Sequence, residues 1–164
     1  MFGPYGYNGS SYFNLVETQT AHIVRCLRHA RQGGATSVEV RPAAVERPFA
    51  EVVRATRDAL AAQGFGVLTE IDMQATLKAK IGADIAPQVI LGACRPPLAH
   101  AAILAEPSIG LLLPCNVVVQ DIGGGRTEVA AIDPVASMQA IANPRLKQAA
   151  EQVGAKLKKV IENL

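Results

Sequence analysis

Two cysteines and a histidine in the middle of the chain are the residues best suited to chemistry. Cys94 ends an apolar stretch, "PQVILGAC", and His100 follows it by six residues. Cys115 lies inside the most apolar run of the chain, "LLLPCNVVVQD", directly after Pro114. A cysteine beside a base can act as a nucleophile, and paired cysteines can act as a redox couple or as metal ligands. These residue types set the first hypotheses about function.

Each of these residues also has a plain structural interpretation. Cysteine commonly behaves as a small buried hydrophobe, and this interpretation is favoured for Cys94 and Cys115. A surface position on a helix is favoured for His100. Metal binding requires several ligating side chains to converge, so we predict neither a metal site nor a cofactor. The sequence has no GxxxxGK[ST] or GxGxxG motif, and its "IGGGR" stretch is typical of a hairpin turn.

Composition restricts the class of protein. The chain has 164 residues, of which 49% are hydrophobic, a length that suits one domain with a small appendage. The net charge is only +2, aromatic residues make up 4%, and tryptophan is absent. Without a dense basic block or stacking aromatics, we predict no nucleic-acid partner.

Three cysteines, Cys26, Cys94 and Cys115, do not form a disulfide framework in the sequence, because their number is odd and no CxxC spacing occurs. Free thiols favour a reducing compartment. No secretory signal is recognisable, and no apolar run reaches the roughly 18 residues of a membrane-spanning helix. We therefore expect a cytoplasmic protein without a membrane partner.

Hydrophobic periodicity and Gly/Pro punctuation predict the order of the elements. In the strand over 65–72, every second residue from Phe65 to Ile71 is expected to face the same side. This order predicts an α+β fold with an open, largely antiparallel sheet and helices on one face. The expected helices cover 15–31, 49–63, 72–81, 96–106, 133–143 and a segment from 144 onward, the expected strands cover 36–40, 65–72, 87–94, 108–121 and 127–133, and 41–48 is expected to be a connector.

Pro114 interrupts the longest of these strands. Proline cannot donate to a strand ladder, so the run is expected to break into two half-strands, 109–113 and 115–121. Such a break often re-aims side chains. Cys115 and Asn116 would then be presented near Cys94.

Three long stretches carry a resemblance to a known family. They are "GFGVLTEIDMQATLKAKIG" at 64–82, "ILGACRPPLAHAAILAEPSIGLLLPCNVVVQD" at 90–121 and "AAIDPVASM" at 130–138. In this order and spacing they resemble the DUF302 family, a domain of unknown function, over about residues 36–164. The resemblance implies a curved antiparallel sheet with packed helices, similar to the TATA-binding-protein arrangement, and a homodimer. It implies no particular reaction.

One family motif departs from its usual form. The family has Gly-Ala-Cys-Asn-Pro where this chain has Gly92-Ala93-Cys94-Arg95-Pro96. The change places a positive charge beside Cys94, so a ligand contact made by the asparagine does not carry over. The second motif, Leu-Pro-Cys-Asn at 113–116, is intact.

Residues 2–42 resemble a different family. Their Gly-Pro and Asn-Gly-Ser stretch, followed by a helix and "VEVRP", is similar to the C-terminal tail of flavin-containing Baeyer–Villiger-type monooxygenases. The dinucleotide fingerprints of those enzymes are absent, so no flavin chemistry is implied for this chain. We expect residues 1–35 to form an N-terminal helical extension and residues 36–164 to form the DUF302-like domain.

The sequence leaves three functions open and does not decide whether the protein is an enzyme. The first is a homodimeric module that binds a small ligand or a partner without catalysis. The second is a thiol-dependent redox enzyme or sensor that uses Cys94 and Cys115. The third is an accessory domain of a flavin monooxygenase. No catalytic residue is assigned, and the candidate ligand-binding residues are Gly92, Cys94, Arg95, His100, Pro114, Cys115 and Asn116.

Overall fold

The structure, a computed structural model, describes residues 39–138, 141 and 143–164. The expected helix over 15–31 and the expected extension over 1–35 lie outside these residues. None of the described helices is long and apolar enough to cross a membrane. The described elements are β1 (Glu39–Val45), α2 (Phe49–Ala62), β2 (Gly66–Asp72), α3 (Met73–Ile81), β3 (Gln88–Cys94), α4 (Pro96–Ala105), the 3-10 helix η1 (Pro107–Leu112), β4 (Cys115–Gly123), β5 (Arg126–Ile132), α5 (Pro134–Met138) and α6 (Pro144–Glu162).

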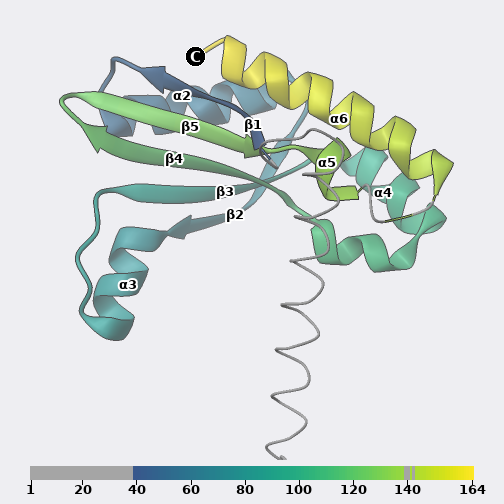
Figure 1. The fold of residues 1–164 in the computed structure, drawn as a ribbon, viewed down its shortest axis with the longest axis horizontal. Coiled ribbons are helices and arrows are strands. Elements are labelled where there is room, and N and C mark those ends of the chain that lie inside the picture. Colours follow the sequence, from purple (N-terminus) through teal and green to yellow (C-terminus); the bar gives the residue numbers. More distant parts are fainter. Residues whose placement is uncertain (1–38, 139–140, 142) are drawn as a thin grey trace, which may run out of the picture. The chain divides into compact units, whose positions relative to one another are not determined.

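The five strands form one sheet in the order β1-β5-β4-β3-β2, and every neighbouring pair is antiparallel (Figure 1). β4 and β5 are joined by a tight turn in which Gly124 and Gly125 have φ angles of 66° and 73°. Hairpin turns that match the strand twist require such positive angles, which glycine adopts without steric cost. The strands β1 and β2 form the two edges. This sheet confirms the α+β fold predicted from the sequence.

Local capping explains where two of the helices begin. The Asp72 side chain accepts a hydrogen bond of 2.8 Å from the backbone N–H of Ala75 at the start of α3. At the start of α6, the Asn143 side chain accepts one of 3.1 Å from the N–H of Arg145. Each side chain satisfies a donor that the first turn of a helix leaves free.

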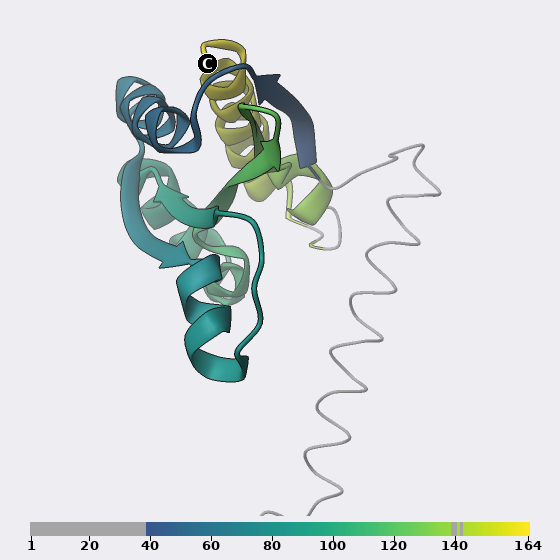
Figure 2. The ribbon, with the colours of Figure 1, turned by 90° about the vertical axis from the view of Figure 1, so that its left-hand side faces the viewer.

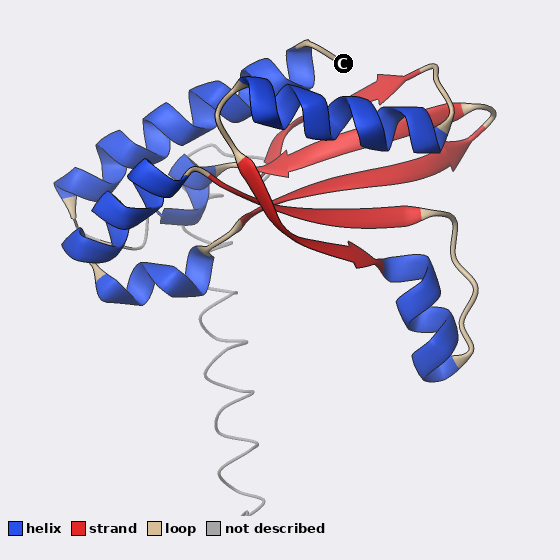
Figure 3. Ribbon diagram, turned by 180° about the vertical axis from the view of Figure 1, so that it is seen from behind, coloured by secondary structure: helices blue, strands red, loops and turns tan. Residues whose placement is uncertain are grey.

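The helices α2 and α6 lie on the same side of the sheet and cover it (Figures 2 and 3). Each presents an apolar stripe to the strands, as an amphipathic helix on a sheet must. We call this covered side the closed face and the opposite side the open face. The buried residues of α2 are Val52, Val53, Thr56 and Leu60, and those of α6 are Leu146, Ala150, Leu157, Val160 and Ile161.

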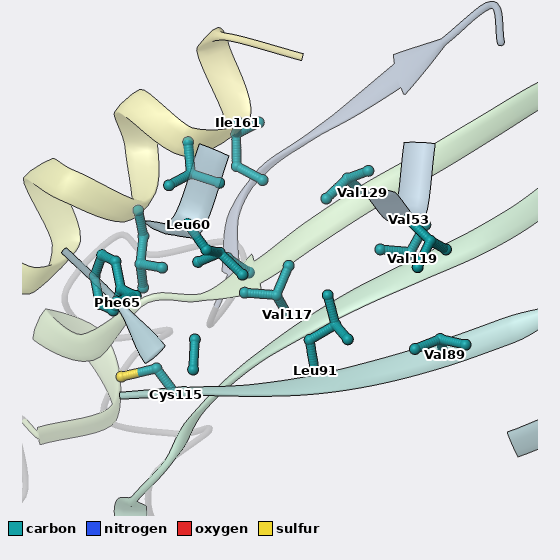
Figure 4. Packing of buried hydrophobic residues seen from close by; sticks show 14 of the residues in the cluster. Val53, Leu60, Phe65, Val89, Leu91, Cys115, Val117, Val119, Val129 and Ile161 are labelled. Carbon is teal, nitrogen blue, oxygen red and sulfur yellow. The ribbon is translucent and has the colours of Figure 1, made fainter. Parts of the chain in front are cut away.

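Alternate residues of the strands point into the core beneath these helices (Figure 4). Leu91 of β3 pairs with Val117 of β4, which pairs with Ala131 of β5, and all three are buried. Phe65 and Cys115 lie at one end of this cluster, and Val89 lies at the other (Figure 4). The core therefore runs along the sheet and reaches the Cys115 thiol.

A second, smaller core joins α4, η1, α5 and α6 beyond the ends of β3 and β4. Its buried members are Ala102, Ile109, Met138, Leu146 and Ala150. The two cores meet near Cys115, so the loops that follow β3 and precede β4 are held between the sheet and this helical cluster.

Most predicted elements are confirmed, but the first strand is displaced. A strand over 36–40 with a connector over 41–48 was expected, whereas β1 continues to Val45. Pro42 lies inside β1, which the sequence pattern does not favour. β1 is an edge strand, and its register shifts between Val40 and Ala43. Edge positions and bulges are where a sheet accepts proline.

The predicted half-strand over 109–113 is wrong. Residues 107–112 form η1, in which Ile109 is fully buried and Leu111 is 89% exposed. Pro107 begins this helix, and the Glu106 side chain caps it by accepting from the Ser108 N–H. The apolar composition of the run concealed a one-sided helical turn. The second predicted half-strand, from residue 115, is confirmed as β4.

The expected alternation along β2 is also wrong. The pairing of β2 with β3 shifts between Val67 and Thr69. Val67 therefore pairs with the closed-face residue Ala93, whereas Thr69 pairs with Gly92 and belongs to the open face. Such a bulge inserts one residue and reverses the alternation beyond it.

Candidate functional site

The structure divides the predicted site residues into three groups. Gly92, Pro114 and Asn116 lie on or beside the open face, at the ends of β3 and β4. The second group, Cys94, Arg95 and Cys115, lines a small cavity. His100 stands apart from both groups. The chain thus places most of the predicted residues within one region but not within one pocket.

Gly92 provides room for two neighbouring side chains. It pairs with Asn116 across the strands. A Cβ atom at this position would lie 2.1 Å from Oγ1 of Thr69 and 2.7 Å from Cγ of Pro114. Both distances are far below a normal contact, so only glycine fits without movement of its neighbours. The role of Gly92 is therefore to let Thr69 and Pro114 pack over the strand.

Thr69 is a neighbour that the sequence did not reveal. The unbroken alternation expected for 65–72 gave no indication of the bulge that turns Thr69 toward Gly92. The peptide bond between Leu113 and Pro114 is cis. Pro114 itself lies between η1 and β4, where the expected break in the apolar run is confirmed.

The cavity of the second group measures about 30 Å³. It lies where the end of β3, the start of β4 and the helices α4, α5 and α6 meet. Its lining is almost entirely apolar, with Arg95 as its one charged side chain among the described residues. The residues that line it are Phe65, Ala93, Cys94, Arg95, Leu98, Ala99, Ala102, Leu113, Cys115, Met138, Ala149, Ala150 and Val153.

Both cysteines that line this cavity are free and buried. Burial raises the pKa of Cys94. Burial, together with the nearby charge of Cys94, raises the pKa of Cys115 to about 11. Desolvation penalises the thiolate, and a second thiolate in the neighbourhood repels it. Both groups are therefore protonated thiols at neutral pH.

His100 does not approach these thiols as a base. It is exposed on α4, whereas the residues that α4 contributes to the cavity are Leu98, Ala99 and Ala102. Within residues 39–138, 141 and 143–164, no group of three or more His, Cys, Asp or Glu side chains is arranged to hold a metal ion. The arrangement of a nucleophilic cysteine with a histidine is absent from this part of the chain.

A second hollow lies beside the first, between α5 and α6. It is a cleft of about 620 Å³, a volume in the range of small-molecule sites. Met138 and Ala150 line both the cleft and the thiol cavity. Met138 could not be predicted from the sequence as a lining residue, because a lone methionine in a short helix has no distinguishing pattern. The lining residues of the cleft are Val135, Met138, Ile141, Asn143, Pro144, Lys147 and Ala150.

The family model described as "Domain of unknown function DUF302" matches residues 43–164, from β1 through α6. This match covers the sheet from the second half of β1 onward and every residue of the three groups. The chain belongs to the DUF302 family. The resemblance seen in the sequence is thereby confirmed for this part of the chain.

A solved structure agrees with this DUF302 assignment. The crystal structure of an uncharacterized conserved DUF302 protein from Bacillus stearothermophilus is 27% identical in sequence, with a TM-score of 0.69. The alignment covers 75% of this chain and 95% of the other. No curated protein matches this chain. The family match begins after residues 2–42, for which the resemblance to flavin monooxygenases stays a prediction.

Proposed function

We propose that this DUF302 domain is a non-catalytic binding module that associates with a second copy of itself through the open face of its sheet. The observation that carries the proposal is a row of apolar side chains on that face. Ile71 of β2 pairs with Ile90 of β3, which pairs with Val118 of β4. All three remain partly exposed, Ile71 by 43%.

The row differs from the usual outer face of an antiparallel sheet. Such a face normally alternates polar residues with the buried ones of the opposite side. Here Val118 stands between the buried residues Val117 and Val119, so both faces of β4 are apolar at its middle. An exposed apolar row that crosses three strands is typical of an interaction surface.

The surroundings of the row favour a second copy as the partner. On one side lie Thr69, Gly92 and Asn116, and on the other lie Gln88 and Gln120. Neither flank carries a charge on β3 or β4, and the carboxylate next to them on this face is Glu128 of β5, which pairs with Gln120. In a dimer with a twofold axis, the same surface of each copy forms the interface. The apolar rows of the two copies would then contact each other, and so would their amide side chains.

β2 adds a second reason for self-association. It is an edge strand, and all seven of its residues are exposed. Exposed edges are usually protected in native proteins, either by charges or by a covering element. Leu68, which is 63% exposed, lies on this edge beside the apolar row. The homodimer implied by the family resemblance supports the same interpretation.

The thiol-dependent alternative has less support. A cysteine that acts as a nucleophile or in thiol–disulfide exchange reacts as the thiolate. Burial raises the pKa of both Cys94 and Cys115, which disfavours that form. Small-molecule binding is better accommodated by the cleft between α5 and α6 than by the thiol cavity, which is too small for an organic ligand. Two free, buried thiols also fit a reducing compartment, so we propose a cytoplasmic location.

The test is the oligomeric state of matched variants, measured by light scattering or sedimentation equilibrium over a range of concentrations. Val118→Glu places a charge in the apolar row, and Leu104→Glu places the same charge on α4, at a position 73% exposed and away from the sheet. The wild type and Leu104→Glu are expected to dimerise at micromolar concentration, and Val118→Glu is expected to be monomeric. A monomeric wild type, or equal dimerisation of the two variants, would contradict the proposal.

A further inference from the structure

The helix α3 projects from the open-face side of the sheet, opposite α2 and α6 (Figures 1, 2 and 3). It connects β2 to β3 and contacts both strands, so it stands at one corner of the sheet. None of its nine residues is buried, and Ile81, the last of them, is 73% exposed. Helices this short are marginal in water unless they pack against another element. The described part of the chain leaves much of this helix uncovered.

The proposed dimer would bring α3 to the level of the partner subunit. Two sheets that pack face to face lie roughly 10 Å apart, and a helix with its side chains is about as wide, roughly 10–12 Å. A helix that stands out from the corner of one open face therefore reaches the level of the other sheet. Which part of the partner it meets depends on the direction of the twofold axis.

Two directions of this axis are compatible with aligned sheets. The axis between two facing sheets lies parallel to both, and aligned sheets keep their strands within about 30° of each other. An axis along the strands places α3 against the partner's β1–β5 edge, at the same end of the sheet. An axis across the strands places α3 against the partner's β2 and β3, at the opposite end.

A line of paired residues on the open face runs from the base of α3 to the β1–β5 edge. Gln88, the first residue of β3 after α3, pairs with Gln120 of β4. Gln120 pairs with Glu128 of β5, and Glu128 pairs with Ala44 of β1. Glu128 is half-buried and Ala44 is exposed. This edge therefore presents a carboxylate beside a small side chain, at the end of the sheet where α3 stands.

The charges favour the axis along the strands. The last turn of α3 carries Lys78 and Lys80. An axis along the strands brings these cations toward Glu128 of the partner subunit. An axis across the strands brings them to the uncharged corner around Gly92 and Asn116 instead. Complementary charges fix the orientation of an interface, so the carboxylate on the β1–β5 edge distinguishes the two arrangements.

We propose that α3 of each copy packs on the partner's β1–β5 edge, with Lys80 facing Glu128 and Ile81 contacting Ala44. Lys80 is exposed and forms no ion pair among the described residues. The contact covers an edge strand, as native sheets require. This inference rests on the proposed self-association and specifies its geometry.

A charge-reversal cycle on the full-length protein tests the polar contact by sedimentation equilibrium. Lys80→Glu and Glu128→Lys are each expected to weaken dimerisation by about tenfold or more, because each places like charges together twice in a symmetric dimer. The combined variant should return to within about threefold of the wild type. Lys159→Glu is the matched control, because it makes the same change of charge at an exposed position of α6 and should leave the affinity unchanged.

A pair of matched truncations tests the apolar contact. Ile81 and Leu104 are both 73% exposed, so truncating either leaves the core of one copy intact. Ile81→Ala is expected to weaken dimerisation by roughly tenfold, because the dimer buries this side chain twice. Leu104→Ala on α4 should have no effect. Equal affinities of the two variants would overturn the contact.

Disulfide cross-linking tests the position of α3 directly. In a Cys26→Ser background, Ala44→Cys/Ile81→Cys should give a covalent dimer on mild oxidation, while the remaining cysteines are buried. Within one copy, β1 and β3 are three strand spacings or roughly 14 Å apart, too far for a disulfide. The control, Leu104→Cys/Ile81→Cys in the same background, should stay monomeric on a denaturing gel.

The outcomes separate this contact from the self-association on which it rests. A dimeric wild type without rescue in the charge cycle, or without the Ala44→Cys/Ile81→Cys cross-link, would overturn the α3 contact and leave the proposed dimer in place. A monomeric wild type would overturn both. Rescue together with the specific cross-link is the expected result.

Discussion

The two faces of β4 present the same kind of residue to different surroundings. Val117 and Val119 point to the closed face and have no exposed surface, whereas Val118 between them points to the open face and is only half-buried. Composition does not distinguish these valines, and their difference comes entirely from which side α2 and α6 cover. The comparison shows that this sheet is apolar on both sides although the described helices cover only one.

The first prediction tests whether the two faces differ in stability as well as in exposure. Leu91→Ala on the closed face should lower the free energy of unfolding by about 2–5 kcal/mol, because it leaves a cavity in a packed core. The neighbouring variant Ile90→Ala, on the open face, should cost less than about 1 kcal/mol at concentrations where the protein is monomeric. Urea unfolding checks both values. If Leu91→Ala and Ile90→Ala lowered the free energy of unfolding equally, the two faces would contribute equally to stability, contrary to this prediction.

The second prediction concerns pH and the thiol at the end of the closed face. Burial and Cys94 raise the pKa of Cys115 from 9.0 to about 11, so the folded state holds this proton more tightly than the unfolded state. Stability is then fully present below pH 9 and falls as pH rises toward 11, by about 2–3 kcal/mol from this group. Urea unfolding of the reduced, metal-free protein should show the fall.

The control for this pH effect is the third cysteine. Cys26→Ser should keep the same pH dependence, whereas Cys115→Ala should flatten it between pH 9 and 11. A Cys115→Ala curve that runs parallel to the wild type would show that other groups cause the fall. Burial would then not raise the pKa of the Cys115 thiol.

The third prediction addresses the open face at Gly92. A methyl group here meets Thr69 and Pro114, so Gly92→Ala should destabilise the fold by about 1–3 kcal/mol through overpacking. Gly110→Ala is the matched control, because nothing lies within 4 Å of its added Cβ, and its effect should stay within about 0.5 kcal/mol.

A double-mutant cycle identifies the cause of that loss. Thr69→Ala removes the nearest atom, so the Thr69→Ala/Gly92→Ala pair should recover part of the stability that Gly92→Ala loses. Additive losses in thermal or urea unfolding would mean that the two residues do not touch. The open face would then lack the tight packing described for this corner.

The smallest effect is expected at the edge of the closed face. Glu70 of β2 turns toward α2 and forms an ion pair with Arg57, and both side chains are about two-fifths exposed. Glu70→Gln should cost only about 0.2–1 kcal/mol, because exposed ion pairs contribute little. The loss should shrink at high salt. A larger loss that does not depend on salt would mean that the Arg57–Glu70 ion pair is shielded from solvent, like the buried residues of the closed face.

The helices, strands and turns were largely predictable because the residues that begin and end them lie within or next to them in the sequence. Asp72 and Asn143 begin helices, and the glycines at 123–125 form the hairpin turn. The break at Pro114 was also predictable. The errors fell where a distant partner decides the outcome, namely at Pro42, which an edge strand accepts, and at the bulge before Thr69.

The candidate site shows the same division. The sequence indicated Cys94, Arg95 and Cys115, and these three do line one cavity. It also grouped Gly92 and Asn116 with them, but the register of β3 and β4 directs that pair to the open face. A one-residue change of register reverses the side of every residue in a strand, and periodicity in a single strand carries no information about its neighbour.

The order of the elements in the DUF302 region, their caps and turns, and the fold class can be predicted from the sequence alone, because they depend on spacing and on the conformations of nearby residues. Which apolar residues are covered, and which residues line the cavity beside Cys115, depend on the tertiary structure. Met138 lines the cavity of Cys94 and Cys115 because α5 packs with α6 and with α4, and α4 lies far from both in the sequence. Such contacts depend on how distant elements pack together, and the pattern of residues within one element does not determine this.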